Sequence, residues 1–455
     1  MLPRGVAAGH PATVAAGIET LEAGGTAADA AVAACLASCV AETVMTGLLG
    51  GGHALHWDGR EALCLDCFVD VPSGDGAPPL ELRVPFGEEL VHYAIGPGTC
   101  GVPGLPAGLD ALHTRFGRLP WTRLVEPALG LARTGVTMPP AHAACLAMLA
   151  PVFTMRPDGA RIYAPEGRPL EAGETLAQPG LTAVLELVAA EGAGTFYRGA
   201  LGEALLAVEG VAVNGADLAR YEARWSTPVE VSYAGRRLLT RAGITGVPET
   251  LGRLPRLAGL GARERVHALL TALGAPAPGA AGHTTNIVAA DGEGSVCVLT
   301  SSLGLGTGDF LPGLDLHLNS MLGEADLVLE PLQPRDRMQS MMAPSLALGA
   351  DGPELALGAA GGTRLRTALV GVAAGVLDEG LAPTEAVLRP RFHRAGTVVN
   401  AEPGVDEDAL ADLEGAGATV RRWPAFHHYF GGVSLIARTG AAGDPRRSGH
   451  AATLP

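Results

Sequence analysis

The chain has 455 residues, of which 47% are hydrophobic, 17% charged and 4% aromatic, and its formal net charge is -15. This composition is typical of a globular protein with a large core, and its acidic balance, without a block of Lys or Arg, argues against nucleic acid or an anionic membrane as partners. No apolar run reaches the ~18–20 residues that span a bilayer, and the first residues lack the apolar stretch of a signal peptide, so we expect no membrane partner and a cytoplasmic location.

Cysteine usage argues against a metal site. The seven cysteines include one C-x-x-C pair, Cys64 and Cys67, in a strand-like segment. A zinc site of this kind needs a second pair of ligands, which the sequence does not supply. We therefore expect buried free thiols, no metal and no cofactor.

The first predicted elements are two helices. Pro11 begins the first helix, and the Gly-Gly pair at 24–25 ends it. Thr26 caps the second helix, and Asp29 favours its positive end. Residues 27–40 are almost all small or apolar, so this second helix must be buried.

The middle of the chain alternates helices with glycine-rich segments. Residues 46–52 lead into a strand, and no Lys-Ser/Thr follows them to make a phosphate loop. Helices are expected over 109–116 and over 121–132, the latter interrupted by Pro127. Residues 236–280 contain repeated Gly, Ala and Pro with a weak pattern, which predicts a loop. No linker or internal repeat divides the chain, so its length fits two or three domains or one layered unit.

Two later segments contain candidate reactive groups. Residues 282–302 form two strand-like runs around an Asp-Gly-Glu-Gly turn, which predicts a β-hairpin. Taken alone, Thr284 at the start of the first run is an ordinary β-branched strand residue. Farther on, a strand over 354–357, a turn over 358–362 and a helix capped by Thr363 would place free backbone N–H groups at a positive helix end.

Several short segments occur in an order typical of one enzyme family. They are 9–13 (GHPAT), 21–32 (LEAGGTAADAAV), 50–52 (GGG), 101–108 (GVPGLPAG), 117–120 (GRLP), 126–128 (EPA), 196–199 (FYRG), 217–221 (DLARY), 361–364 (GGTR) and 444–447 (DPRR). This order resembles the γ-glutamyltransferases, which are self-cleaving N-terminal-nucleophile hydrolases. The resemblance implies an α+β fold of four layers, αββα, and a small-molecule amide as substrate.

The resemblance also implies the reacting residue. Residues 284–286 match the family's Thr-Thr-His hairpin in register, which makes Thr284 the nucleophile and places autocatalytic cleavage between His283 and Thr284. The products would be a large fragment, 1–283, and a small fragment, 284–455, that remain associated as a heterodimer. Cleavage is useful because the new α-amino group, with a pKa near about 8, can take the proton of the threonine hydroxyl.

Other site residues follow from the same match. Gly361 and Gly362 correspond to the paired glycines that form the family's oxyanion hole. Ser302 stands where the family has a hydroxyl that orients the nucleophile. The substrate-binding positions implied by the resemblance are Ser340, Asn319 and Ser320.

The predicted substrate clamp departs from the family pattern. Family members bind the α-carboxylate of the substrate with an arginine, but the corresponding segment 66–72 contains none. Gly323 takes the position of the acid that binds the α-amine, with Glu324 and Asp326 nearby. Arg83 and Arg337 could replace the arginine, although surface exposure is their expected state. We therefore expect poor turnover of γ-glutamyl amides such as glutathione.

Three functions remain open from the sequence. The first is a γ-glutamyltransferase-like hydrolase or acyltransferase, and the second is a relative with another substrate, such as an acylase or a carbon–carbon bond hydrolase of specialised metabolism. The third is a non-catalytic binding relative, which need not cleave itself. A nucleotide-binding enzyme is not supported, because the glycines lack a complete fingerprint and an acidic ribose partner.

Overall fold

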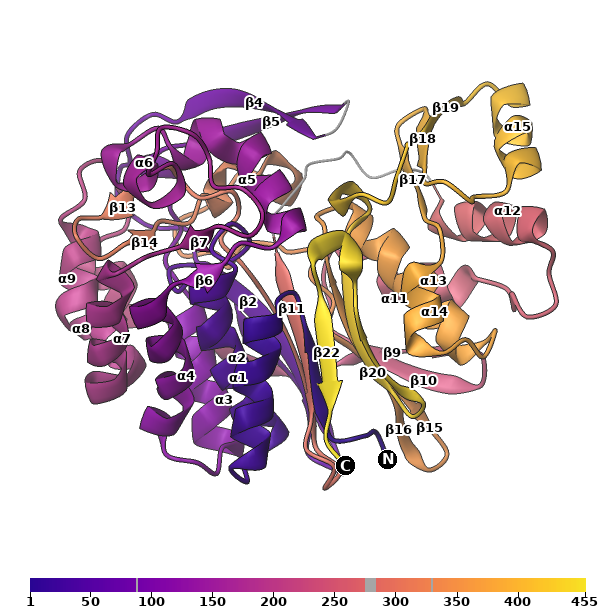
Figure 1. The fold of residues 1–455 in the computed structure, drawn as a ribbon, viewed down its shortest axis with the longest axis horizontal. Helices are drawn as coiled ribbons and strands as arrows, with labels where there is room; N and C mark the ends of the chain where they lie inside the picture. Colours follow the sequence, from indigo (N-terminus) through magenta and orange to yellow (C-terminus); the bar gives the residue numbers. More distant parts are fainter. Residues whose placement is uncertain (87–88, 275–283, 329) are drawn as a thin grey trace.

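Two β-sheets form the centre of the protein (Figure 1). The computed structural model describes residues 1–86, 89–274, 284–328 and 330–455. The first sheet has the strand order β22-β1-β11-β12-β2-β3-β8. Its strands are β1 (Gly5–Ala8), β2 (Gly51–Trp57), β3 (Ala62–Cys67), β8 (Arg224–Ser226), β11 (Thr285–Ala290), β12 (Val296–Ser302) and β22 (His450–Thr453).

The second sheet has the order β21-β20-β16-β15-β10-β9, and all its neighbouring strands are antiparallel. Its strands are β9 (Val229–Tyr233), β10 (Arg236–Thr240), β15 (Ser345–Gly349), β16 (Gly352–Ala360), β20 (Gly432–Ala437) and β21 (Gly440–Gly443).

The two sheets pack face to face because their strands are apolar on both sides. Along β11, Val288 and Ala290 pack between the sheets with Ile436 of β20. Ile287 and Ala289 point the other way, into the core shared with the helices. Successive strand residues face opposite sides of a sheet, so a strand buried on both faces must be apolar throughout.

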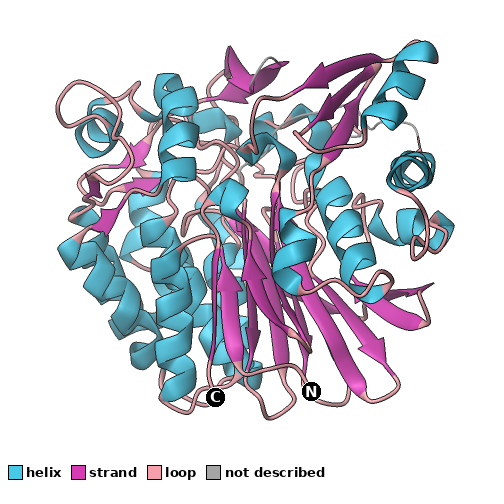
Figure 2. Ribbon diagram, turned by 45° about the vertical axis from the view of Figure 1, so that its right-hand side comes forward, coloured by secondary structure: helices cyan, strands magenta, loops and turns pink. Residues whose placement is uncertain are grey.

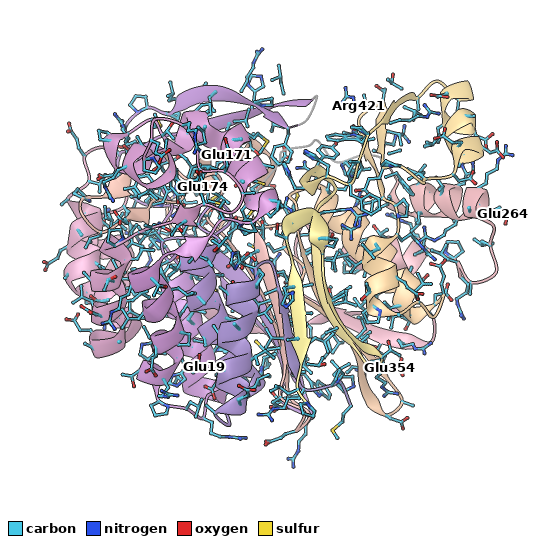
Figure 3. All side chains as sticks on the ribbon, viewed as in Figure 1. Glu19, Glu171, Glu174, Glu264, Glu354 and Arg421 are labelled. Carbon is cyan, nitrogen blue, oxygen red and sulfur yellow. The ribbon has the colours of Figure 1, made fainter. Side chains whose placement is uncertain are left out.

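Helices cover both outer faces, as Figure 2 shows, and this confirms the predicted αββα architecture. Exposed Glu19 and Glu264 lie on the two opposite outer layers (Figure 3). Over the first sheet lie α1 (Pro11–Glu22), α2 (Ala27–Ala41), α3 (Leu105–Phe116), α4 (Trp121–Thr134) and α7 (Gly180–Glu191), and over the second lie α11 (Val247–Arg253), α12 (Ala262–Leu273), α13 (Arg364–Leu377) and α14 (Pro383–Leu388).

Smaller elements surround these layers. The helices are α5 (Pro140–Phe153), α6 (Pro157–Tyr163), α8 (Thr195–Arg198), α9 (Ala200–Leu206), α10 (Gly215–Arg220) and α15 (Glu407–Gly415). The strands are β4 (Leu80–Phe86), β5 (Glu89–Ile95), β6 (Val136–Thr137), β7 (Thr175–Leu176), β13 (Phe310–Leu311), β14 (Leu316–His317), β17 (Phe392–Ala395), β18 (Val398–Ala401) and β19 (Thr419–Arg422).

Local sequence signals locate the first helices well. Thr26 and Asp29 form a reciprocal capping box, and every residue of α2 is buried, as predicted. Helix α3 begins at Leu105, earlier than expected, because Pro106 occupies its first turn, where a missing N–H breaks no helical hydrogen bond. Helix α4 continues through Pro127 to its end, so the predicted interruption is wrong.

The later hairpin and helix start are also confirmed. Strands β11 and β12 pair around the turn, where Asp291 accepts hydrogen bonds from the N–H groups of Glu293 and Ser295 at 2.8 and 3.0 Å. Thr363 is the N-cap residue of α13, but its side chain makes no capping hydrogen bond.

The loop predicted over residues 236–280 is wrong. This segment contains β10, α11 and α12, while residues 275–280 lie outside the described part of the chain. Helix α12 buries Val266, Leu269, Leu270 and Leu273, which recur at helical spacing. The surrounding Gly and Pro residues obscure that pattern, and packing against the second sheet's helices stabilises the element.

All seven cysteines are buried and free. Within the four described ranges, no group of three or more His, Cys, Asp or Glu side chains is arranged to hold a metal ion. Across the same ranges, no helix combines the length and apolarity needed to cross a membrane.

Candidate active site

Thr284 lies one residue before β11, at the open end of the hairpin. Thr285 pairs with Ser301 of β12, so the antiparallel register continued by one residue brings Thr284 opposite Ser302. Both side chains are buried, with exposed fractions of 6% and 5%. Both residues line the same cavity.

The cavity around Thr284 gathers residues from distant parts of the chain. Gly362 and Ser340 join Thr284 and Ser302 in its polar wall. The remaining lining residues are apolar, Phe68, Met321, Leu327, Met341, Met342 and Leu365, or acidic, Glu324 and Asp326. We call this space the acyl cavity. The described residues that line it include no Arg or Lys.

The turn between β16 and α13 presents two backbone amides. φ is +137° at Gly361 and +56° at Gly362, a region that favours glycine. In the described part of the chain, neither N–H donates a backbone hydrogen bond, whereas those of Arg364 and Leu365 donate to the carbonyls of Gly361 and Gly362 at 3.1 Å. The strand itself extends to Ala360. This turn can therefore supply two donors at a positive helix end to a developing oxyanion.

The two serines of the acyl cavity are held by local backbone groups. The Oγ of Ser302 accepts a hydrogen bond of 3.0 Å from the N–H of Gly304. The Oγ of Ser340 accepts one of 3.2 Å from Met342, and its carbonyl accepts one of 2.8 Å from Arg241. Both hydroxyls are thereby fixed at the wall of the cavity.

Asn319 and Ser320 lie apart from the lining residues of the acyl cavity. The amide of Asn319 donates to the carbonyls of Leu49 and Gly101 at 2.9 Å each, and its oxygen accepts from the N–H of Gly101 at 3.0 Å. Ser320 accepts from the N–H of Leu305 at 3.1 Å. Both side chains thus brace loops behind the site. His283, the other predicted cleavage residue, lies outside the described residues.

Glu324 supplies the acidic group that the sequence comparison assigned to a glycine. Gly323 faces away, because an added Cβ would lie 1.8 Å from the carbonyl oxygen of Ala94. Glu324 instead lines the acyl cavity with 6% exposure, and its Oε1 has no hydrogen-bond partner among the described residues. Burial, and then the charge of Asp326, raise its pKa to about 8. A carboxyl next to the position of Gly323 therefore lies at the wall of the acyl cavity.

Arg337 is not the exposed residue that the sequence suggested. Its guanidinium binds Asp70 at 2.6 Å and Asp66 at 2.8 Å, and it stacks on the ring of Tyr221. Its side chain is only 8% exposed. Arg83 on β4 is exposed as expected. Neither arginine lines the acyl cavity, so neither replaces the missing half of the clamp.

Arg337→Met is expected to lower the stability of the protein by about 3 kcal/mol, because it leaves buried Asp70 with only the exposed Arg224, 3.9 Å away, as a cation. The melting temperature, measured in a single-chain Thr284→Ala background, would report the change. Arg133→Met is the matched control, since the Arg133–Glu186 pair is exposed on both sides and should matter little. Equal melting temperatures for the two variants would contradict the structural role of Arg337.

A second buried carboxyl lies on the other side of the nucleophile. Glu42 accepts hydrogen bonds of 2.6 Å from the hydroxyls of Thr13 and Thr285. Burial raises its pKa to about 7, against the effect of these two hydrogen bonds. Glu42 and Thr284 line one further cavity. Local sequence patterns do not single out Glu42, because its hydrogen-bond partners lie in two other segments.

Comparison with known proteins gives a consistent result. The sequence model of the Gamma-glutamyltranspeptidase family matches residues 13–272 and 268–454. The chain is 29% identical to Acylase ACY 1 proenzyme of Pseudomonas sp. (strain SE83), over 95% of the chain and 89% of that protein. It is 26% identical to the Capsule biosynthesis protein CapD proenzyme of Bacillus anthracis, over 98% and 90%. A crystal structure of cephalosporin acylase from Bacillus halodurans has the same fold, with a TM-score of 0.84 and 22% identity over 100% and 96% of the chains.

Proposed function

The chain belongs to the gamma-glutamyltranspeptidase family, and from this premise we propose that it is an amide hydrolase or acyltransferase that cleaves itself before Thr284. The observation that supports the proposal is the convergence of Thr284, Ser302 and Gly362 on one cavity. Relatives named as proenzymes support the self-cleavage.

The proposed reaction uses Thr284 as nucleophile and base. Its free α-amino group, with a reference pKa near about 8, takes the proton of the hydroxyl as Oγ1 attacks the substrate carbonyl. The N–H groups of Gly361 and Gly362 stabilise the negative oxygen. The carbon–nitrogen bond then breaks, the amine leaves with the proton, and the acyl group remains on Oγ1 as an ester. Water or a second amine attacks this ester and frees Thr284.

The two cleavage fragments, 1–283 and 284–455, would remain associated as a heterodimer. In the first sheet, β11 pairs with β1 on one side and with β12 on the other, and β12 pairs with β2. In the second sheet, β10 pairs with β15. Each sheet thus contains paired strands from both fragments, and separation would break ladder hydrogen bonds and expose the apolar core between the sheets.

The acyl cavity favours an acylase-like specificity over a γ-glutamyl one. A γ-glutamyl group is a zwitterion, and no arginine lines the cavity to bind its carboxylate. The apolar lining suits a hydrocarbon chain, and Glu324 suits a cationic or hydrogen-bond-donating group at its end. We therefore propose an acyl group with an apolar body and a donor group, and without a carboxylate.

Three 4-nitroanilides with matched chains test this proposal. Their acyl groups are 5-aminopentanoyl, hexanoyl and adipoyl, which end in a cation, a methyl group and an anion. We expect kcat/KM to decrease in that order, and glutathione to be a poor substrate. At a pH above about 8, where Glu324 is ionised, Glu324→Gln should reduce the preference for the cation about 10- to 100-fold, because the contact with a carboxylate is lost. Glu330→Gln, an exposed change nearby, is the control.

The same preference should depend on pH. Because the pKa of Glu324 is raised to about 8, its carboxyl is neutral below that pH and ionised above it. The kcat/KM of the 5-aminopentanoyl substrate divided by that of the hexanoyl substrate should therefore increase as the pH rises through about 8. Titration of the α-amino group of Thr284 affects both substrates equally and does not change this ratio. A pH-independent ratio in the wild type, or fastest turnover of the adipoyl substrate, would contradict the proposed acyl specificity.

A further inference from the structure

A second cavity adjoins the acyl cavity behind Gly362. Gly362 and Met341 line both spaces, so the candidate oxyanion site lies at their boundary. The other lining residues of the second cavity are Ile244, Thr245, Leu270, Leu273, Gly274, Thr363, Arg366, Thr367, His393 and Arg394. We call this space the basic cavity.

Two arginines give the basic cavity its charge. Arg366 comes from α13 and is half-buried, and Arg394 comes from β17 and is exposed. Within the described part of the chain, neither forms an ion pair, and Arg394 donates only to the carbonyl of Gly396 at 3.2 Å. Among the described residues, the lining contains no Asp or Glu. The charges of Arg253 and Glu249 act on Arg366 only from beyond ion-pair distance. A half-buried guanidinium without a paired carboxylate is a favourable position for a bound anion.

His393 adds a neutral polar group. Its Nδ1 lies 3.1 Å from the hydroxyl of Thr367, and its side chain is 8% exposed. Burial, followed by the charges of Arg364 and Arg366, lowers its pKa to about 3. The ring is therefore uncharged near neutral pH, and the positive charge of the cavity comes from the arginines.

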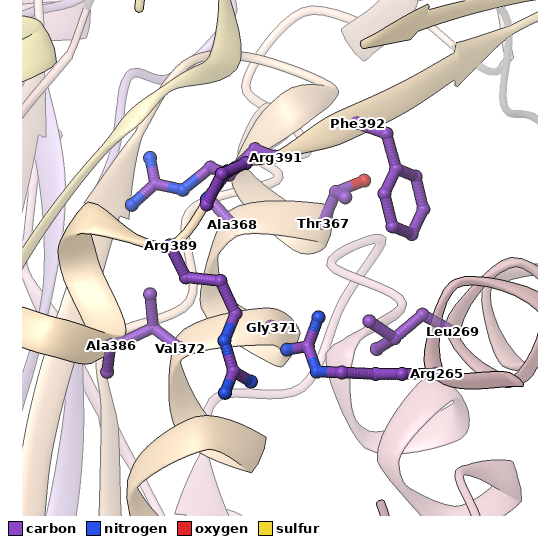
Figure 4. A pocket seen from close by; sticks show the side chains of 11 residues that line it. Arg265, Leu269, Thr367, Ala368, Gly371, Val372, Ala386, Arg389, Arg391 and Phe392 are labelled. Atoms are coloured by element: carbon purple, nitrogen blue, oxygen red, sulfur yellow. The ribbon is translucent and has the colours of Figure 1, made fainter. Parts of the chain in front are cut away.

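A third cavity, shown in Figure 4, provides a contrast on the other side of Thr367. Three arginines line it too, but each has a carboxylate partner. Arg265 and Arg389 both bind Glu379, at 3.1 and 2.5 Å, and Arg391 binds Asp444 at 2.5 Å. Each of its arginines thus has a carboxylate of the protein within ion-pair distance, although Arg265 and Arg389 share one, whereas the described residues give neither arginine of the basic cavity such a partner.

We propose that the basic cavity binds the amine half of the substrate, and that this half bears a carboxylate or similar anion held by Arg366 and Arg394. This inference rests on the proposed function and adds the leaving group to it. With the scissile carbonyl oxygen at Gly362, the acyl half enters the acyl cavity and the amine half enters the basic cavity. Glu324 on one side and the arginines on the other give the two halves opposite charge requirements.

This charge separation orients the amide. A reversed substrate would bring its anion against the carboxyls of Glu324 and Asp326, and any cation against Arg366. In a transfer reaction the acceptor amine attacks from the side that the leaving amine vacates. An acceptor with a carboxylate therefore fits the same cavity.

The test uses two amides with one acyl group and matched leaving amines, 4-aminobenzoate and 4-aminobenzamide. The acyl group is the best of the three tested above. We expect the wild type to favour the carboxylate in kcat/KM by about 10-fold or more, as for a charge-assisted contact. Arg366→Gln, and more fully the double variant with Arg394→Gln, should remove this preference by lowering kcat/KM for the carboxylate about 10-fold more than kcat/KM for the benzamide. Arg263→Gln is the control, because Arg263 lies on α12 outside the cavity and pairs with Asp412.

The outcomes separate this inference from the proposed function. Equal turnover of the two amides by the wild type, or a preference that survives in the double variant, would overturn the basic cavity as the leaving-group site while the enzyme assignment stands. An equal loss of both activities in folded variants would also overturn it, since a general defect is not selective for charge. Release of neither amine by wild type would overturn the proposed function and this site with it.

Discussion

Thr284→Ala is expected to remain a single chain of 46.1 kDa, whereas the wild type should separate on a denaturing gel into fragments 1–283 and 284–455. The reason is that the hydroxyl of Thr284 is the proposed nucleophile for the peptide bond before it as well as for the substrate amide. Without the hydroxyl no ester can form, and without cleavage no α-amine is available as base. Amide turnover should therefore fall to background in the same variant.

Intact-mass spectrometry and N-terminal sequencing of the small fragment would measure this. Thr284→Ser is the matched control, because it keeps a hydroxyl and should still cleave. A wild type that stays intact after long incubation at neutral pH would refute the nucleophile assignment. Cleavage of Thr284→Ala at the same bond would refute it equally.

Gly362→Pro is expected to reduce kcat/KM by about 100- to 1000-fold, because proline removes an N–H that would meet the oxyanion. In the described part of the chain this N–H makes no backbone hydrogen bond, so its loss breaks no backbone contact seen there. We therefore expect the variant to lose catalytic rate and not its fold. Proline must also shift φ at this position from +56°. Kinetics should therefore be compared only for variants that have separated into two fragments and keep the wild-type circular dichroism spectrum.

Gly362→Ala is the control for backbone conformation. Alanine keeps the N–H and tolerates positive φ at a cost of about 1–2 kcal/mol, so most activity should remain. Full activity in a well-folded Gly362→Pro variant would eliminate this amide as an essential donor. An equal loss in both variants would show that the turn conformation, and not the donor, limits the reaction.

The elements that the sequence predicted correctly depend on short-range interactions. The capping box of Thr26 and Asp29 spans three residues, and a short turn joins the two strands of the β11–β12 hairpin. Each of these signals can be recognised from a few neighbouring residues alone. The helix α12 was missed because its flanking glycines and prolines suggest a loop, and its stability comes from packing against distant residues.

The site was predictable in part. The resemblance assigned roles to Thr284, Ser302 and Gly362, and the structure brings all three to one cavity, although their chemical roles stay predictions. Asn319 was expected at the substrate but braces two loops instead of lining that cavity. The sequence pattern gives the place of Asn319 in the chain. The direction in which its side chain points depends on the packed fold.

The sequence by itself determined the family pattern, the hairpin register and the absence of an arginine after the glycine-rich loop. Only the tertiary structure decided which charged groups are buried and which of them have partners. Arg337 meets Asp70 across 267 residues of chain, so no local pattern could reveal that its charge is already used. Glu324 and Arg366 contribute opposite charges to adjoining cavities for the same reason. The ionisation of a side chain and the strength of its electrostatic interactions depend on its burial and on the charges within a few ångströms. Folding alone determines both.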